Sequence, residues 1–142
     1  MKIALAQLNY HVGNFSSNTQ KIIAAIHEAE KQSADIVVFS EQSISGYPAR
    51  DFLEFEDFLN QCNNAVIEIA KHTANIAVLI GCPRKNPVTE GKDLFNSAYC
   101  IYQGEIKQIV DKTLLPTYDV FDECRYFEAN NKFEVIHFKG VK

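Results

Sequence analysis

The stretch ADIVVFSEQ, residues 34–42, decides the fold class. Its centre, Ile36–Phe39, is a short and unbroken apolar run, which is typical of a strand buried on both faces of a sheet. A polar Ser-Glu-Gln group follows at once and marks the end of the strand. Such a strand favours layered α/β architecture over an antiparallel sheet with one wet face.

The segments before and after this strand are predicted to form the strands and helices that such an architecture needs. A strand is predicted over Lys2–Leu8, and a helix opens at Ser17, where Gln20 stands in capping-box spacing. A second helix is predicted over roughly Asp51–His72, followed by a buried strand over residues 75–81. The first eighty or so residues therefore alternate strand and helix, which indicates an α/β layered sheet.

The rhythm changes after Gly81. Residues 82–96, rich in proline and glycine turns, are expected to be irregular. Residues 97–112 predict a β-hairpin that turns near Gln103-Gly104, and an aromatic, charged loop follows as far as residue 127. A last strand is predicted over residues 132–138.

Composition narrows the class of protein. With 142 residues, 46% of them hydrophobic and 23% charged, the chain has the size and balance of one globular domain. A net charge of −4 gives no basic surface for nucleic acid or anionic membranes, and no apolar run approaches the roughly 20 residues that span a bilayer. The four scattered cysteines predict reduced thiols in a cytoplasmic protein, and neither they nor the histidines show the spacing of a metal site.

Two residues at strand ends are candidates for chemistry. Glu41 stands just past Ile36–Phe39, where ligands bind in open α/β sheets, and it could act there as a general base. The plain alternative is a hydrated loop residue. Lys112 ends the hairpin strand, where an ammonium in a dry site would stabilise an oxyanion. Its plain alternative is a solvated lysine paired with Asp111.

The loop after Lys112 supplies a third candidate, Glu123 in FDECRYF. A surface pair between an acidic residue and Arg125 would explain it plainly, but aromatic and proline residues make this loop rigid. Asp51 is placed to cap the second helix. Among the cysteines, Cys124 is the only one close to these residues, and the other three are expected to pack in the core.

Four strings carry a resemblance to a known superfamily. They are KIALAQLNYHVGNFSSNTQKI, ADIVVFSEQSISGYPARDFL, GKDLFNSAYCIYQGEI and DKTLLPTYDVFDECRYF. Together they resemble the nitrilase, or carbon–nitrogen hydrolase, superfamily, and more narrowly the amino-terminal glutaminase domain of glutamine-dependent NAD⁺ synthetases. Gly-Tyr-Pro-x-x-Asp-Phe-Leu and Leu-Pro-x-Tyr-x-Val-Phe-Asp-Glu-x-Arg-Tyr-Phe belong to that narrower group.

The resemblance implies an α-β-β-α sandwich, of which residues 1–142 would form the N-terminal part. It implies Glu41 as the general base, Lys112 as the second catalytic residue, Glu123 as a supporting glutamate and Tyr118 at the border of the glutamine pocket. Glutamine hydrolysis would use no cofactor, and the ammonia would reach a separate synthetase domain that needs ATP and Mg²⁺. The resemblance also favours a homo-oligomer.

The nucleophile of such an enzyme is a cysteine that follows the next apolar strand, usually in a Cys-Glu-Asp string. None of the four cysteines stands there, so the chain by itself is expected not to hydrolyse glutamine. Three interpretations stay open: the front half of the glutaminase domain of an NAD⁺ synthetase, a stand-alone nitrilase-type amidase, or a non-catalytic interaction or oligomerisation module.

Overall fold

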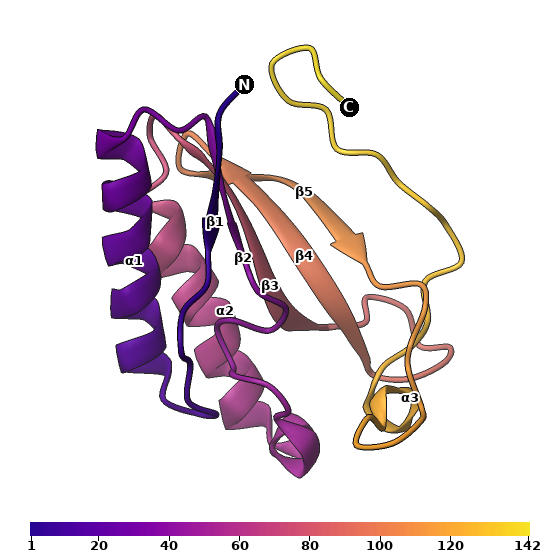
Figure 1. Ribbon diagram of the computed structural model, residues 1–142. Helices are drawn as coiled ribbons and strands as arrows, with labels where there is room; N and C mark the ends of the chain where they lie inside the picture. Colours follow the sequence, from indigo (N-terminus) through magenta and orange to yellow (C-terminus); the bar gives the residue numbers. More distant parts are fainter.

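One sheet and two long helices make up most of the molecule (Figure 1). The computed structural model describes residues 1–142. The sheet has five strands in sequential order; β1, β2 and β3 run parallel, and β4 and β5 are antiparallel to their neighbours. The strands are β1 (Ile3–Ala6), β2 (Ile36–Phe39), β3 (Ala77–Lys85), β4 (Leu94–Tyr102) and β5 (Glu105–Asp111).

Both long helices, α1 (Phe15–Lys31) and α2 (Glu56–Ala70), cover the same face of the sheet (Figure 1). Their apolar stripes face inward: Ile22 and Ile26 of α1 and Ile69 of α2 are wholly buried. Burying one such side chain contributes about 1.5–3 kcal/mol of hydrophobic free energy. Neither helix has the length and apolar character that crossing a bilayer requires.

The opposite face of the sheet carries no helix (Figure 1). Along β1, Ala4 and Ala6 pack against the helix-side core, whereas Ile3 and Leu5 point the other way and are 51% and 74% exposed. This period of two is that of a strand, so the outer side chains of β1 form an apolar edge on the open face.

The first helix begins earlier than the capping pattern predicted. Asn14 is its N-cap, and the Asn14 side chain accepts a hydrogen bond from the Ser17 backbone N–H at 3.2 Å. Asparagine is a strong N-cap residue. The earlier start also lets Phe15 pack edge-on against Phe58 of α2, with ring centroids 4.9 Å apart.

The predicted helix over Asp51–His72 is in fact two elements. A 3₁₀ helix, η1 (Arg50–Glu54), comes first, and the extended backbone of Phe55 separates it from α2. Asp51 therefore caps neither helix. Its carboxylate accepts a hydrogen bond from the Tyr126 hydroxyl at 2.5 Å and pairs with Arg125 at 3.0 Å, so Arg125 does form the surface pair that the plain reading of the loop offered.

Residues 82–96 are more regular than predicted, because β3 continues through Pro83 to Lys85 and β4 begins at Leu94. A proline is tolerated here since the pairing of β3 with β2 has already ended at Leu79, so no β2 carbonyl needs an N–H from Pro83. The hairpin of β4 and β5 is confirmed, and its turn lies at Gln103-Gly104, both with positive φ.

The last predicted strand, residues 132–138, is wrong. This segment makes only one isolated bridge, between Phe138 and Val141, and Phe133 is 82% exposed. The alternating pattern suits a strand, but a strand also needs a partner. From the edge strand β5, the segment receives a single hydrogen bond, which the Gln108 side chain donates to the Val135 carbonyl at 3.5 Å.

Candidate active site

Three polar side chains meet where β2, β4 and β5 approach the same end of the sheet. Glu41 lies two residues beyond β2, Asn96 is the third residue of β4, and Lys112 follows β5 directly. Gly81 of β3 allows the chain after β2 to cross closely, because a Cβ at this position would lie 2.5 Å from the Gln42 backbone nitrogen. Only glycine leaves room for that approach.

Lys112 bridges two carboxylates. Its Nζ lies 3.0 Å from Oε1 of Glu41 and 2.9 Å and 3.1 Å from the two oxygens of Glu123. The side chains of Glu41, Lys112 and Glu123 are 46%, 29% and 4% exposed, respectively. The structure thus brings together the three residues that the sequence singled out, with Glu123 deepest and Glu41 most open to solvent.

Glu123 reaches this position because the loop after β5 folds back. It is the first residue of a one-turn helix, α3 (Glu123–Tyr126), and its backbone N–H donates to the Pro116 carbonyl at 3.2 Å. A buried carboxylate needs partners for its lone pairs. Besides Lys112, the Tyr47 hydroxyl donates to Oε1 of Glu123 at 3.2 Å.

The contacts within the cluster determine the protonation states of Lys112 and Tyr47. Desolvation disfavours the ammonium of Lys112, but its hydrogen bonds with Glu123 and Glu41 outweigh that effect and hold the pKa of Lys112 above its ordinary value. Burial, followed by the nearby negative charge of Glu123, raises the pKa of Tyr47 to about 12. Around neutral pH, Lys112 is therefore a cation and Tyr47 a neutral hydrogen-bond donor.

Two further residues of the cluster, Asn96 and Tyr47, are not among those predicted from the sequence. The Nδ2 atom of Asn96 lies 2.5 Å from Oε1 of Glu41 and 3.4 Å from Oε2 of Glu123. One signal was present: Asn96 and Ser97 interrupt an otherwise apolar strand, and both are buried. Tyr47 carried no such signal, because turn chemistry accounts for Gly-Tyr-Pro.

Asp111 does not pair with its neighbour Lys112. Its carboxylate instead receives two hydrogen bonds from Arg84 of β3, at 2.9 Å and 2.5 Å, and a third from the Ser97 hydroxyl at 2.6 Å. Successive residues of a strand point to opposite faces, so Asp111 and Lys112 are directed apart. The plain alternative for Lys112, a local ion pair, is therefore wrong.

Carboxylates, an ammonium and an amide in this arrangement can accept a proton and stabilise negative charge on a bound oxygen. The model for the carbon-nitrogen hydrolase family matches residues 2–142. The chain belongs to the carbon-nitrogen hydrolase family.

Curated relatives that are similar to this chain include glutamine-dependent NAD(+) synthetases. A glutamine-dependent NAD(+) synthetase from Synechocystis is 42% identical over 144 residues, which are 99% of this chain and 26% of the relative. Another, from Aquifex aeolicus, is 38% identical over 144 residues, 100% of this chain and 24% of the relative. The chain thus spans about a quarter of the length of these relatives.

Solved structures of the family share the fold. The glutamine-dependent NAD+ synthetase from Acinetobacter baumannii superposes with a TM-score of 0.86 and 36% identity, covering 97% of this chain and 26% of that one. A variant of the Nesterenkonia AN1 amidase, from the nitrilase superfamily, gives 0.75 at 21% identity, covering 93% and 49%. The second likeness shows the fold alone. Together they confirm the nitrilase-type α/β fold, of which this chain contributes one sheet and its helices.

Tyr118 and the cysteines lie outside the cluster. Tyr118 is 70% exposed, and its ring packs on Phe121, with centroids 5.5 Å apart, and Phe121 in turn lies beside Tyr47. The exposed thiol of Cys124 contacts the Leu115 carbonyl at 3.8 Å. Cys62, Cys82 and Cys100 are buried, as expected for core residues. No cysteine thiol hydrogen-bonds to Glu41, Lys112 or Glu123, and no group of three or more metal-ligating side chains gathers in the structure.

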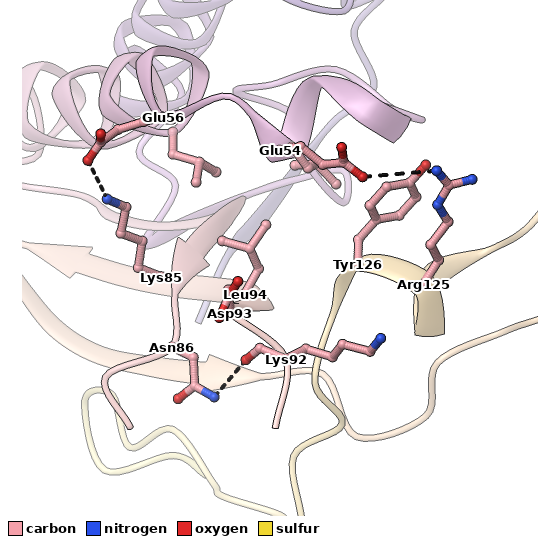
Figure 2. A pocket seen from close by; sticks show the side chains of 11 residues that line it. Glu54, Glu56, Lys85, Asn86, Lys92, Asp93, Leu94, Arg125 and Tyr126 are labelled. Atoms are coloured by element: carbon pink, nitrogen blue, oxygen red, sulfur yellow. Dashed lines mark hydrogen bonds and ion pairs between the residues drawn. The ribbon is translucent and has the colours of Figure 1, made fainter. Parts of the chain in front are cut away.

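Two of the hollows on the surface are possible ligand-binding sites. The larger, about 680 Å³, lies between η1, α2, the β3–β4 ends and α3, and the ion pair of Lys85 with Glu56 crosses it (Figure 2). It contains no member of the cluster. The smaller, about 380 Å³, is bordered by Glu41, Asn96 and Lys112 and continues over apolar side chains of the open face. Of these two hollows, only the smaller borders the cluster, and a third, of about 110 Å³, touches it through Tyr47 and Glu123.

Proposed function

We propose that residues 1–142 form the first part of a glutamine-hydrolysing domain in which Glu41 is the general base, Lys112 stabilises the oxyanion and Glu123 supports Lys112. One observation carries this proposal: a single ammonium bridges two carboxylates, at 3.0 Å and 2.9 Å, at the edge of an apolar hollow. Once the rest of the domain covers it, such a cluster would hold positive and negative charge close together in a site with little water.

The reaction needs a thiol, which we place in another part of the same domain. Glu41 takes the proton of that thiol, and the thiolate attacks the side-chain amide carbon of glutamine. Lys112 stabilises the oxyanion of the tetrahedral intermediate. Glu41 returns the proton to the departing nitrogen, ammonia leaves, and a thioester remains. Glu41 then takes a proton from water, whose oxygen attacks the thioester carbon. The carbon–sulfur bond breaks, glutamate is released, and the departing thiolate takes the proton back from Glu41.

The open face of the sheet is where that remaining part would dock. Ile3 and Leu5 are apolar and exposed there, and the hollow beside Glu41 and Lys112 opens onto the same face. A second sheet laid over it would bury these side chains, complete the α-β-β-α sandwich of the family and bring the thiol to the cluster.

The names of the relatives indicate which reaction would use the released ammonia. Those 34–42% identical to this chain are named glutamine-dependent NAD(+) synthetases. We therefore propose that ammonia released here serves the ATP-dependent amidation of deamido-NAD⁺ to NAD⁺ in a linked synthetase domain. ATP and Mg²⁺ would belong to that domain, and hydrolysis itself would need no cofactor.

A stand-alone amidase is the second candidate, since the site by itself suits amide hydrolysis with or without a linked domain; the likeness to the Nesterenkonia amidase bears on the fold only. The names of the closer relatives favour the synthetase. A non-catalytic module has least support, because it would have no use for a buried carboxylate, Glu123, held beside Lys112.

Glutamate release by the complete protein tests the proposal. Glu41→Gln and Lys112→Ala should each lower kcat/KM by at least about 100-fold, while thermal melting reports whether the variants fold. Lys107→Ala is the matched control, because this lysine of β5 pairs only with Glu105, at 2.6 Å, and should leave turnover unchanged. Near wild-type turnover by either site variant would refute the role of that residue.

A further inference from the structure

Asn96 gives its side-chain hydrogen bonds to the two carboxylates and to no backbone group. We infer that Asn96 is a positioning residue that holds the Glu41 carboxylate so that Oε2, and not Oε1, is the atom that exchanges protons with the reactants. This inference rests on the proposed function of Glu41 as general base and specifies which of its atoms does the work.

The two oxygens of Glu41 differ in their surroundings. Oε1 receives a hydrogen bond from Lys112 at 3.0 Å and another from Asn96 at 2.5 Å, so both of its lone-pair directions are used. Oε2 receives no hydrogen bond from any group of the chain. A proton that approaches this carboxylate therefore finds free lone pairs only on Oε2.

Glu123 shows the contrast. Its Oε1 accepts from Tyr47 at 3.2 Å and from Lys112 at 3.1 Å, and its Oε2 accepts from Lys112 at 2.9 Å and from Asn96 at 3.4 Å. Both oxygens are occupied, and the side chain is 4% exposed. Glu123 thus holds the donor groups with both of its oxygens, whereas Glu41 has one oxygen that accepts no hydrogen bond.

The backbone of Asn96 is anchored without help from its side chain. Its carbonyl accepts the Lys112 backbone N–H at 2.8 Å, and its partner on β3 is Pro83, which has no N–H to offer. The amide is then free to reach two carboxylates that lie 55 and 27 residues away in sequence. Since both neighbours are acceptors, Nδ2 and not Oδ1 must face them.

An amide suits this position better than a second cation would. Its N–H groups fix the direction of Glu41 by hydrogen bonding, but it adds no full positive charge to lower the proton affinity of the base. Lys112 already supplies the one charge that the oxyanion needs. Asn96 therefore orients the carboxylate without bringing a second full charge into the site.

Asn96→Asp in the complete protein is the direct test, because it keeps the shape of the side chain and replaces the donor with a third carboxylate. We expect kcat for glutamine to fall about 100-fold or more with KM little changed. The acidic limb of the kcat/KM profile should move to higher pH by about one unit, since added negative charge favours protonation of the cluster. Asn63→Asp, the same change at an exposed position of α2, should alter neither. A kcat within threefold of wild type and an unmoved acidic limb would overturn the inference.

A second measurement does not depend on turnover. In crystal structures of the Asn96→Asp and Asn96→Ala proteins, the Glu41 carboxylate should rotate away from its present contact with Lys112. If Oε1 stays on Nζ with the carboxylate plane unchanged in both, Asn96 does not position it. Absence of glutamine hydrolysis in the wild-type protein would refute the proposed function, while these structures would still decide the role of Asn96.

Discussion

Lys112 and Glu123 are 11 residues apart in the chain, and Nζ of the first lies 2.9 Å from Oε2 of the second. The loop between them leaves β5 and returns through Pro116, whose carbonyl accepts the Glu123 backbone N–H. Its aromatic side chains, Tyr118 and Phe121, pack on one another and toward Tyr47. The loop therefore acts as a spacer that sets the distance between an ammonium and a buried carboxylate.

Neutralising Glu123 tests that spacer. Glu123→Gln keeps the size of the side chain but turns one acceptor toward Lys112 into a donor. We expect the protein to lose about 1–3 kcal/mol of stability, with a thermal midpoint lower by several degrees, and kcat for glutamine to fall at least about tenfold. Glu54→Gln is the control, because that carboxylate is 64% exposed and only 4.0 Å from Arg125. Equal midpoints for the two variants would contradict the role of Glu123.

The stability of the protein should fall at alkaline pH as Lys112 loses its proton. Its pKa in the folded protein lies above the ordinary value of 10.5, because Glu123 and Glu41 favour the ammonium over the effect of desolvation. Stability from this shift is fully present below the unfolded pKa and is lost as pH rises through the folded pKa. Thermal midpoints measured from about pH 9 to about pH 12 should fall more steeply in the wild type than in Lys112→Met. Parallel curves would count against the ion cluster.

Gly81→Ala should move the loop that carries Glu41. The new Cβ would lie 2.5 Å from the Gln42 nitrogen and 3.0 Å from the Glu41 Cα, and both are backbone atoms that cannot swing aside. Overpacking of this kind costs about 1–3 kcal/mol. We expect a lower thermal midpoint and a fall in kcat larger than the loss of folded protein explains. Full turnover at wild-type stability would show that the crossing is looser than the structure has it.

Residues 1–142 expressed alone should self-associate through the open face of the sheet, where Leu5 is 74% exposed. Size-exclusion chromatography should give species larger than a monomer that bind a hydrophobic dye. Leu5→Lys should reduce the association, whereas Ile67→Lys, on the outer surface of α2 and 50% exposed, should not. A dye-negative monomer would contradict this expectation.

The sequence patterns predicted those features of the fold that depend on residues close together in the chain. The run Ile36–Phe39 is a strand at the predicted bounds, and the Gln103-Gly104 turn closes the predicted hairpin, because period and turn chemistry are set by neighbouring residues. The helix start shifted from Ser17 to the Asn14 cap, since both residue types cap helices well. A strand over residues 132–138 failed because its pattern could not reveal the missing partner.

The residues of the site also fall into two groups: those that local sequence predicts and those that depend on distant contacts. Glu41 and Lys112 could be predicted because each stands where a strand ends, but the roles of Asn96 and Tyr47 depend on contacts across 55 and 76 residues. No local pattern encodes such contacts. The cytoplasmic location and the homo-oligomer suggested by the sequence stay predictions, as does the place of Tyr118 at the glutamine pocket.

The most direct measurement is a crystal structure of the complete protein with glutamine bound and the nucleophilic cysteine replaced by alanine. We predict that the amide oxygen lies within hydrogen-bond distance of Lys112 Nζ, about 2.7–3.2 Å, and that the alanine methyl faces Oε2 of Glu41. Glutamine bound away from Lys112, with Glu41 turned toward bulk solvent, would contradict it.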